Sequence, residues 1–159
     1  GYGAAKGSPA HDCSKSMAEI IADPELCYYT DRCGFQYWAA TQQQAHFFAH
    51  PATCGGCPFQ GGMNQLWRNQ MLAFSVEGSQ AWAPYQHAFF SVVVHPDNHT
   101  LDKTIAAYKS LIADDPQPAR RRFSTLTSAD FVRAAAARND RELNEWVDWY
   151  GGLYDVAQG

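Results

Sequence analysis

The sequence predicts a small α/β or α+β protein, and three observations lead to that class. Residues 87–96, HAFFSVVVHP, are a continuous β-branched and aromatic run of strand length. Other segments repeat apolar residues at the spacing of a helix face. A helical pattern follows the apolar run directly, as in a βα unit. We therefore expect a small sheet with a central strand at about 86–94, buried on both faces and flanked by about five helices.

Helical signals begin near residue 14. Between residues 14 and 23 apolar residues recur at helical spacing, with an N-cap at Asp12 or Ser14. Residues 25–32 predict a turn or a short strand. Residues 34–50 contain no helix breaker before Pro51, so the pattern predicts a second helix there.

Residues 63–76 give the clearest helical pattern in the chain. Their apolar positions step by four, four and three, as a helix buried on one side requires. These positions are Met63, Trp67, Met71 and Phe74. The Gly- and Pro-rich segment 51–62, which precedes this helix, predicts a loop.

The second half of the chain predicts a helix, a short strand and two further helices. Thr100 is positioned to cap a helix, and residues 120–127 form a strand pattern with a basic start. The phrase TSAD at 127–130 opens the next helix. Asn139 and Glu142 form the start signal of the last one, which Gly151-Gly152 is expected to stop.

Composition predicts a globular protein without a membrane partner. The 159 residues are 46% hydrophobic, and no apolar run approaches the ~20 residues that a bilayer requires. We expect residues 1–10 to be a flexible lead-in and residues 11–159 to be a single domain. The lack of a secretory signal predicts a cytoplasmic protein. A net charge of −4 restricts any contact with DNA to a local patch.

A dense set of candidate metal ligands lies ahead of the helix at 63–76. Its members are His46, His50, Cys54 and Cys57. The two histidines would share one helix face, and the four side chains suit the tetrahedral coordination of a structural Zn²⁺. In the alternative set, Cys27 and Cys33 replace the histidines, and four thiolates would hold Zn²⁺ or an iron–sulfur cluster. The competing interpretation is a helix end followed by a turn with ordinary thiols.

Two groups of polar residues are candidates for contact with nucleic acid. Gln65, Arg68 and Asn69 lie on the helix at 63–76, where Arg and Asn suit phosphates or base edges. The second group is the only dense basic cluster, which suits phosphates. It comprises Arg120, Arg121 and Arg122. The competing interpretations are a solvated helix face and a locally neutralised connection.

His95, Asn98 and His99 allow a third interpretation, an HNH-type nuclease site. In such a site one histidine activates water and others bind a metal ion. The competing interpretation is a strand that ends at His95-Pro96, followed by a turn and a helix cap.

Three phrases support a resemblance to a known family. They are CPF at 57–59, QLWRNQMLAF at 65–74 and HAFFSVVVHPDN at 87–98. Their order resembles a bacterial branch of the PD-(D/E)XK, or restriction-endonuclease-like, superfamily over about residues 57–126. The resemblance implies a nuclease fold in which an Asp and a Glu-x-Lys or Asp-x-Lys pair hold Mg²⁺ for DNA hydrolysis.

The chain departs from that pattern, because none of its sixteen acidic residues has a lysine two positions on. We therefore assign no catalytic residue, and expect the catalytic half either upstream of residue 1 or lost. The sequence predicts a nuclease-like domain that processes or binds DNA. The alternatives are a non-catalytic, metal-stabilised module that binds a protein partner, and an HNH-like metal-dependent nuclease.

Overall fold

The computed structural model describes residues 13–44, 46–49, 55–77, 79, 86–113, 122–138 and 140–154. These residues form seven α-helices, one 3-10 helix and two strands. They pack as two compact units. The first unit takes its residues from 1–90 and 102–122, and the second from 91–101 and 123–159. The chain therefore passes from one unit to the other more than once.

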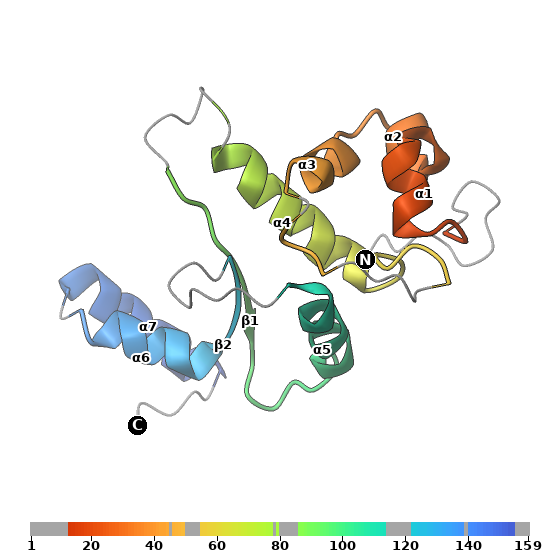
Figure 1. Ribbon diagram of the computed structural model, residues 1–159. Helices are drawn as coiled ribbons and strands as arrows, with labels where there is room; N and C mark the ends of the chain where they lie inside the picture. The colour runs from red at the N-terminus through yellow and green to blue at the C-terminus, as the bar shows by residue number, and fades with distance from the viewer. Residues whose placement is uncertain are drawn as a thin grey trace. The chain divides into compact units, whose positions relative to one another are not determined.

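The first unit is helical and is built around α4, its longest helix (Figure 1). α3 and α5 both contact α4, and α1 and α2 pack against α3. The elements are α1 (Met17–Ala22), η2 (Pro24–Leu26), α2 (Tyr28–Asp31), α3 (Tyr37–Gln43), α4 (Met63–Glu77) and α5 (Asp102–Leu111).

Aromatic rings in mutual contact form the core of the first unit. The rings of Phe59 and Trp67 lie parallel, with centroids 4.9 Å apart and an interplanar angle of 2°. The ring centroids of Trp38 and Trp67 lie 4.9 Å apart, and those of Phe48 and Phe59 also lie 4.9 Å apart. All four side chains are buried. Burying rings of this size is the main stabilising contribution available to a unit of these dimensions.

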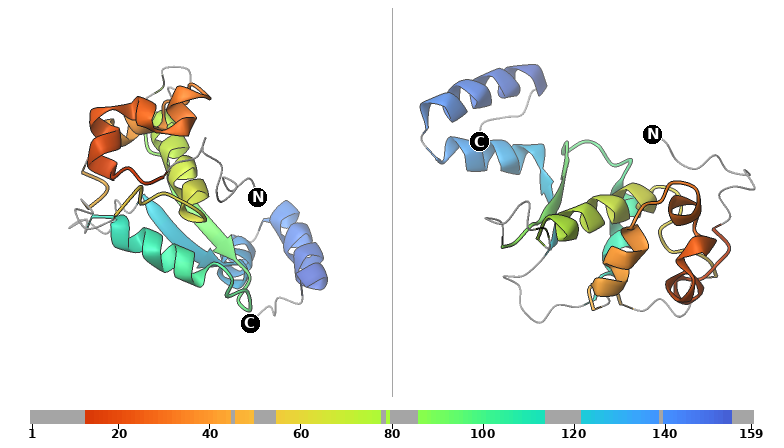
Figure 2. Two further views of the ribbon diagram at one scale, coloured as in Figure 1. Left: turned by 90° about the vertical axis from the view of Figure 1, so that its right-hand side faces the viewer. Right: turned by 90° about the horizontal axis from the view of Figure 1, so that it is seen from above.

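The second unit contains a two-stranded parallel sheet and a pair of helices. β1 (Phe90–Val94), whose first residue is assigned to the first unit, pairs with β2 (Phe123–Thr127). α6 (Ser128–Ala136) follows β2 directly, and α7 (Arg141–Tyr154) lies beside α6 in every view (Figures 1 and 2). Val132 of α6 and Val147 of α7 are buried.

The mixed α/β class is confirmed, with two differences in detail. β1 starts at Phe90, and its residues alternate between half-buried and exposed, so it is not buried on both faces. The sheet formed by the described residues has two strands and so no central strand. The described residues form seven α-helices rather than about five. One of them is α2, which lies in the stretch 25–32 that was predicted to be a turn or a short strand.

The predicted bounds of the helix over 34–50 are wrong at both ends, because the helix found there, α3, spans only Tyr37–Gln43. The next residues pair instead with the end of α5: the Ala49 N–H donates to the Leu111 carbonyl at 2.8 Å, and the Ala113 N–H donates to the Phe47 carbonyl at 2.8 Å. Phe48 forms a β-bridge with Ile112 and is buried. His46 therefore lies after the helix, which removes the shared helix face expected for His46 and His50.

Helix ends differ in three places from the prediction. α1 is capped by Ser16, whose hydroxyl accepts from the Glu19 N–H, and not by Ser14 or Asp12. α7 continues through Gly151-Gly152 to Tyr154. The Asp140 carboxylate accepts from the N–H groups of Glu142 and Leu143 and so caps the start of α7. The predicted cap, Asn139, lies outside the described residues.

Among the helices described, none has the length and apolarity needed to cross a membrane. The expectation of a single domain over 11–159 stays a prediction, since compact packing units and independently folding domains are different properties.

Candidate nucleic-acid interface and thiol cluster

Three of the predicted nucleic-acid-binding residues lie together on α4. Gln65, Arg68 and Asn69 are spaced i, i+3 and i+4, so they share one face of the helix. The Gln65 Nε2 donates to the Asn69 Oδ1 at 3.0 Å, and Gln65 is exposed. Trp67 and Met71 bury another face against the core. The structure thus brings these three polar side chains together.

Arg68 is held in a cage of three aromatic rings. Its guanidinium carbon lies 5.2 Å from the Tyr29 ring, 5.7 Å from the Phe35 ring and 5.2 Å from the Tyr37 ring. The Nη2 also donates to the Tyr37 hydroxyl at 3.2 Å. Contacts of a guanidinium with ring faces are attractive and fix its orientation. The cage residues come from α2, from the turn after it and from the start of α3.

No carboxylate in the described part of the chain pairs with Arg68, although four other arginines have such partners. The pairs are Arg32–Asp31, Arg122–Glu77, Arg133–Asp130 and Arg141–Glu145. The buried Nε of Arg68 also lacks a hydrogen-bond partner among the described residues. Within the described part of the chain, the guanidinium of Arg68 therefore has no charge partner, and its cage leaves some of its N–H donors unused.

Arg122 has a different environment from Arg68. Its Nη1 forms an ion pair with the Glu77 carboxylate, which also accepts from the Ala88 N–H at 2.6 Å. The guanidinium lies 6.0 Å from the rings of Phe74 and Phe89. This partner neutralises the charge of Arg122 within the first unit. Arg120 and Arg121 lie outside the described residues.

Three cysteines of the first unit line one pocket. Cys13, Cys27 and Cys57 surround a cavity of about 40 Å³. Burial, which disfavours a thiolate, raises the pKa of Cys57 to about 12. Cys33 is exposed and outside the pocket lining. The structure therefore adds Cys13 to the predicted thiols, while His50 and Cys54 lie outside the described residues.

A magnesium site does not fit the described residues. Among them, no three His, Cys, Asp or Glu side chains are already arranged to hold a metal ion. The chain also lacks the carboxylate-x-Lys spacing that would position water beside such an ion. No hydrolytic step can be derived from these side chains.

The residues of the HNH hypothesis form ordinary turn contacts. The His95 Nε2 lies 3.4 Å from the Tyr154 carbonyl oxygen, and its Nδ1 accepts from the Asp97 N–H at 3.3 Å. The Asn98 Oδ1 accepts from the N–H and the hydroxyl of Thr100. These contacts fit a strand end followed by a turn better than a water-activating site.

The described residues thus form a mixed α/β protein with an aromatic-lined arginine on α4, and among them no three His, Cys, Asp or Glu side chains are grouped to hold a metal ion. The family model described as the PD-(D/E)XK nuclease superfamily matches residues 59–148, from the loop before α4 into α7. The match covers more than half of the chain, so the chain belongs to this superfamily. No curated protein and no solved structure matches. The resemblance inferred from the sequence is thus confirmed, and it extends past residue 126.

The sequence named Arg68 as a candidate, but it predicted neither the aromatic cage around Arg68 nor the position of Cys13 beside Cys57. Tyr29 stands in a stretch predicted to be a turn or short strand, and Phe35 and Tyr37 stand at the start of a predicted long helix, so no pattern linked them to Arg68. Cys13 belongs to no ligand motif and approaches Cys57 only through tertiary packing. The density of aromatic residues between Tyr28 and Trp38 was the one available signal.

Proposed function

We propose that this nuclease-like domain binds DNA, with Arg68 and the polar face of α4 as the contact surface. The observation that carries the proposal is the caged Arg68, which is oriented by three rings and has no carboxylate partner among the described residues. Membership of a nuclease superfamily supports a polyanionic ligand. A net charge of −4 fits a local contact and not a basic footprint.

The side chains around Arg68 supply the chemistry that DNA recognition uses. A guanidinium donates paired hydrogen bonds to phosphate oxygens. Gln65 and Asn69, on the same face of α4, carry amides that can contact phosphates or base edges. The Phe35 ring is 40% exposed beside the cage, and an exposed ring stacks on an unpaired base. The surface suits single-stranded or locally opened DNA.

Binding is tested by fluorescence anisotropy with labelled single-stranded and duplex oligonucleotides over a series of salt concentrations. We expect Arg68→Gln to weaken binding about tenfold or more, because a charge-assisted hydrogen bond contributes roughly 1.5–3 kcal/mol. The slope of log K against log salt should fall by about one, as for the loss of one phosphate contact.

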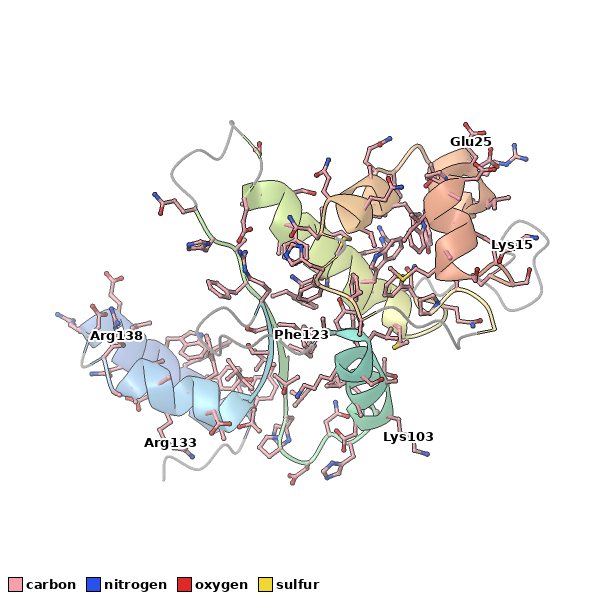
Figure 3. The ribbon with its side chains drawn as sticks, in the orientation of Figure 1. Lys15, Glu25, Lys103, Phe123, Arg133 and Arg138 are labelled. Carbon is pink, nitrogen blue, oxygen red and sulfur yellow. The ribbon has the colours of Figure 1, made fainter. Side chains whose placement is uncertain are left out.

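Arg138→Gln is the matched control. Arg138 follows α6, has an exposed side chain and belongs to the second unit (Figure 3). Because Arg68 also packs on aromatic rings, Gln65→Ala serves as a second test that leaves the cage intact. Equal weakening by Arg138→Gln and Arg68→Gln, or no binding by the wild-type chain, would overturn the proposal.

A protein-binding module is the second candidate, and an exposed apolar surface on α7 favours it. Trp149 and Leu153 are 60% and 57% exposed and stand one helical turn apart. Large apolar side chains grouped on a surface mark interaction sites. If they join copies of this chain, sedimentation analysis will show a concentration-dependent dimer that Trp149→Ser abolishes.

A further inference from the structure

The pocket beside the start of α4 has mainly aromatic and apolar walls. Its volume is about 40 Å³, several times the ~10–15 Å³ that one water molecule needs, and it is partly open to solvent. The large residues of its wall are Ile20, Tyr28, Tyr29, Phe59 and Trp67. A partly open pocket of this size and lining admits the edge of one flat ring, while the rest of the ring stays outside.

Two amide side chains add polar groups to the pocket. Gln60 lies just before α4 and Asn64 lies in its first turn, and both line the wall. An amide both donates and accepts hydrogen bonds. The edges of nucleobases carry donors and acceptors side by side, and Asn and Gln pair with such edges, above all with that of adenine. The lining therefore suits a base, which has apolar faces and a polar edge.

The pocket lies next to the aromatic cage of Arg68. Tyr29 belongs to both, because its ring centre lies 5.2 Å from the Arg68 guanidinium carbon and the residue also lines the pocket. Asn64 stands four residues before Arg68 on α4, so the two side chains are neighbours on one helix face. A nucleotide joins its base to its phosphate through a single sugar. One nucleotide can therefore place its phosphate on Arg68 and its base at the pocket.

We propose that this pocket binds the edge of one unpaired DNA base while Arg68 holds a phosphate of the same strand. The inference rests on the proposed function and extends it, since it names the part of the DNA that the pocket recognises. A base inside a duplex is paired along its edge and stacked on both faces, so only an unstacked or extruded base reaches the pocket. The chain therefore prefers single strands and bulges to an intact duplex.

Two labelled duplexes with the same backbone test the proposal on the full chain. One carries a single extra adenine as a bulge, and the other carries an abasic sugar at the same position. Both present the same phosphates to Arg68, so only the base differs. In fluorescence anisotropy we expect the wild type to bind the adenine bulge about tenfold more tightly, which is the scale for one base stacked on an aromatic ring.

Two pocket variants and one control follow from the lining. Tyr28→Ala removes an aromatic wall of the pocket, and Tyr28 is not one of the three rings around Arg68. We expect it to bind the two duplexes equally, and Asn64→Ala to show a smaller preference than the wild type. Gln43→Ala is the matched amide control, because Gln43 is exposed and outside the pocket lining. It should keep the full preference. Near-ultraviolet circular dichroism checks that each variant is folded.

The outcomes distinguish failure of the base pocket from failure of the proposed function. Equal binding of the two duplexes by the wild type, in a complex that Arg68→Gln still weakens, would overturn the base pocket and leave DNA binding intact. No binding of either duplex would overturn both. A preference lost equally in Gln43→Ala would also contradict the pocket. Displacement of the bulged duplex by an equal concentration of free deoxyadenosine monophosphate would overturn the assignment to a DNA strand.

Discussion

At the residue scale, Thr41 links the two helices that carry the core. Its buried hydroxyl accepts from the Trp67 indole N–H at 3.0 Å and lies within hydrogen-bonding distance of the Tyr37 carbonyl and the Met71 sulfur. A single hydroxyl therefore satisfies the polar atom of a large buried ring. α3 and α4 are held in register at this point.

Replacing Thr41 with valine tests this contact. Valine has nearly the same shape but cannot accept, so the buried Trp67 N–H loses its partner. We expect the free energy of unfolding to fall by about 1–3 kcal/mol in urea titrations. Thr30→Val is the control, because the Thr30 hydroxyl makes only a 3.5 Å contact with the Phe35 carbonyl. A loss at position 30 as large as that at position 41 would contradict the explanation.

Gln70 differs from Thr41, because the polar atoms of its buried side chain form no hydrogen bond with the described residues. The side chain is fully buried, and neither its amide nitrogen nor its oxygen has a hydrogen-bond partner among the described residues. Burying such an amide costs free energy that an apolar side chain of similar volume would not. We expect Gln70→Met to raise the midpoint of urea denaturation. Gln70→Ala, which leaves a cavity, should lower it, and a lower midpoint in Gln70→Met would show that the amide is satisfied.

Residues of the candidate site were predictable only where their arrangement follows from spacing within one helix. Gln65, Arg68 and Asn69 could be predicted, because one helix pattern sets their common face. The rings around Arg68 and the position of Cys13 could not, because they depend on how α1, α2 and α3 pack against α4. Spacing along a chain carries no information about contacts between separate segments.

At the element scale, capping boxes start two helices, one in each unit. In α6 the Thr127 hydroxyl accepts from the Asp130 N–H at 3.0 Å, while the Asp130 carboxylate accepts from the Thr127 N–H at 3.3 Å and from the Thr127 hydroxyl at 2.7 Å. In α1 Ser16 and Glu19 form the same pair. These contacts satisfy N–H groups that the first helical turn leaves free.

The box in α6 predicts a measurable pH dependence. Hydrogen bonds from Thr127, aided by Arg133, lower the pKa of Asp130 below its ordinary value. A lowered pKa in the folded state means that the stabilisation is present above the pKa of the unfolded state, near pH 4. It is lost as the pH falls through the folded value. NMR titration of the Asp130 carboxyl should report the lowered pKa, and Thr127→Val should raise it. An unchanged value in the variant would exclude the capping contact as the cause.

Elements with local signals were predictable, and those shaped by tertiary contacts were not. α4, α5, β2 and α6 follow from periodicity and from the TSAD start signal. α3 ends early because residues 47–49 form hydrogen bonds with the end of α5, which outweigh helix propensity. α7 continues past two glycines, whose cost of roughly 1 kcal/mol each is offset by packing against α6.

At the scale of the whole molecule, the class was predictable and the division into units was not. One apolar run and several helical patterns determine a mixed class. The two units are built from alternating stretches of chain, since α5 belongs to the first unit while the strands on either side belong mainly to the second. Composition does not change at these crossings, so the sequence shows no boundary there.

The chemistry of the whole chain predicts binding of DNA without cleavage. The resemblance implies that hydrolysis in this superfamily needs two carboxylates and a lysine. In this chain no acidic residue has a lysine two positions on. We therefore expect the 159-residue chain, supplied with Mg²⁺ or Mn²⁺, to leave single-stranded and duplex DNA intact on denaturing gels.

The same samples should shift labelled DNA in anisotropy, so that lack of cleavage is not confused with lack of binding. Preparations of Arg68→Gln, made in parallel, identify contaminating nuclease. Cleavage that requires the divalent ion, co-purifies with the wild-type chain and weakens with Arg68→Gln would show that its carboxylates form a catalytic site without the Lys spacing. Intact DNA with retained, salt-dependent binding would instead place recognition on this chain and separate it from hydrolysis.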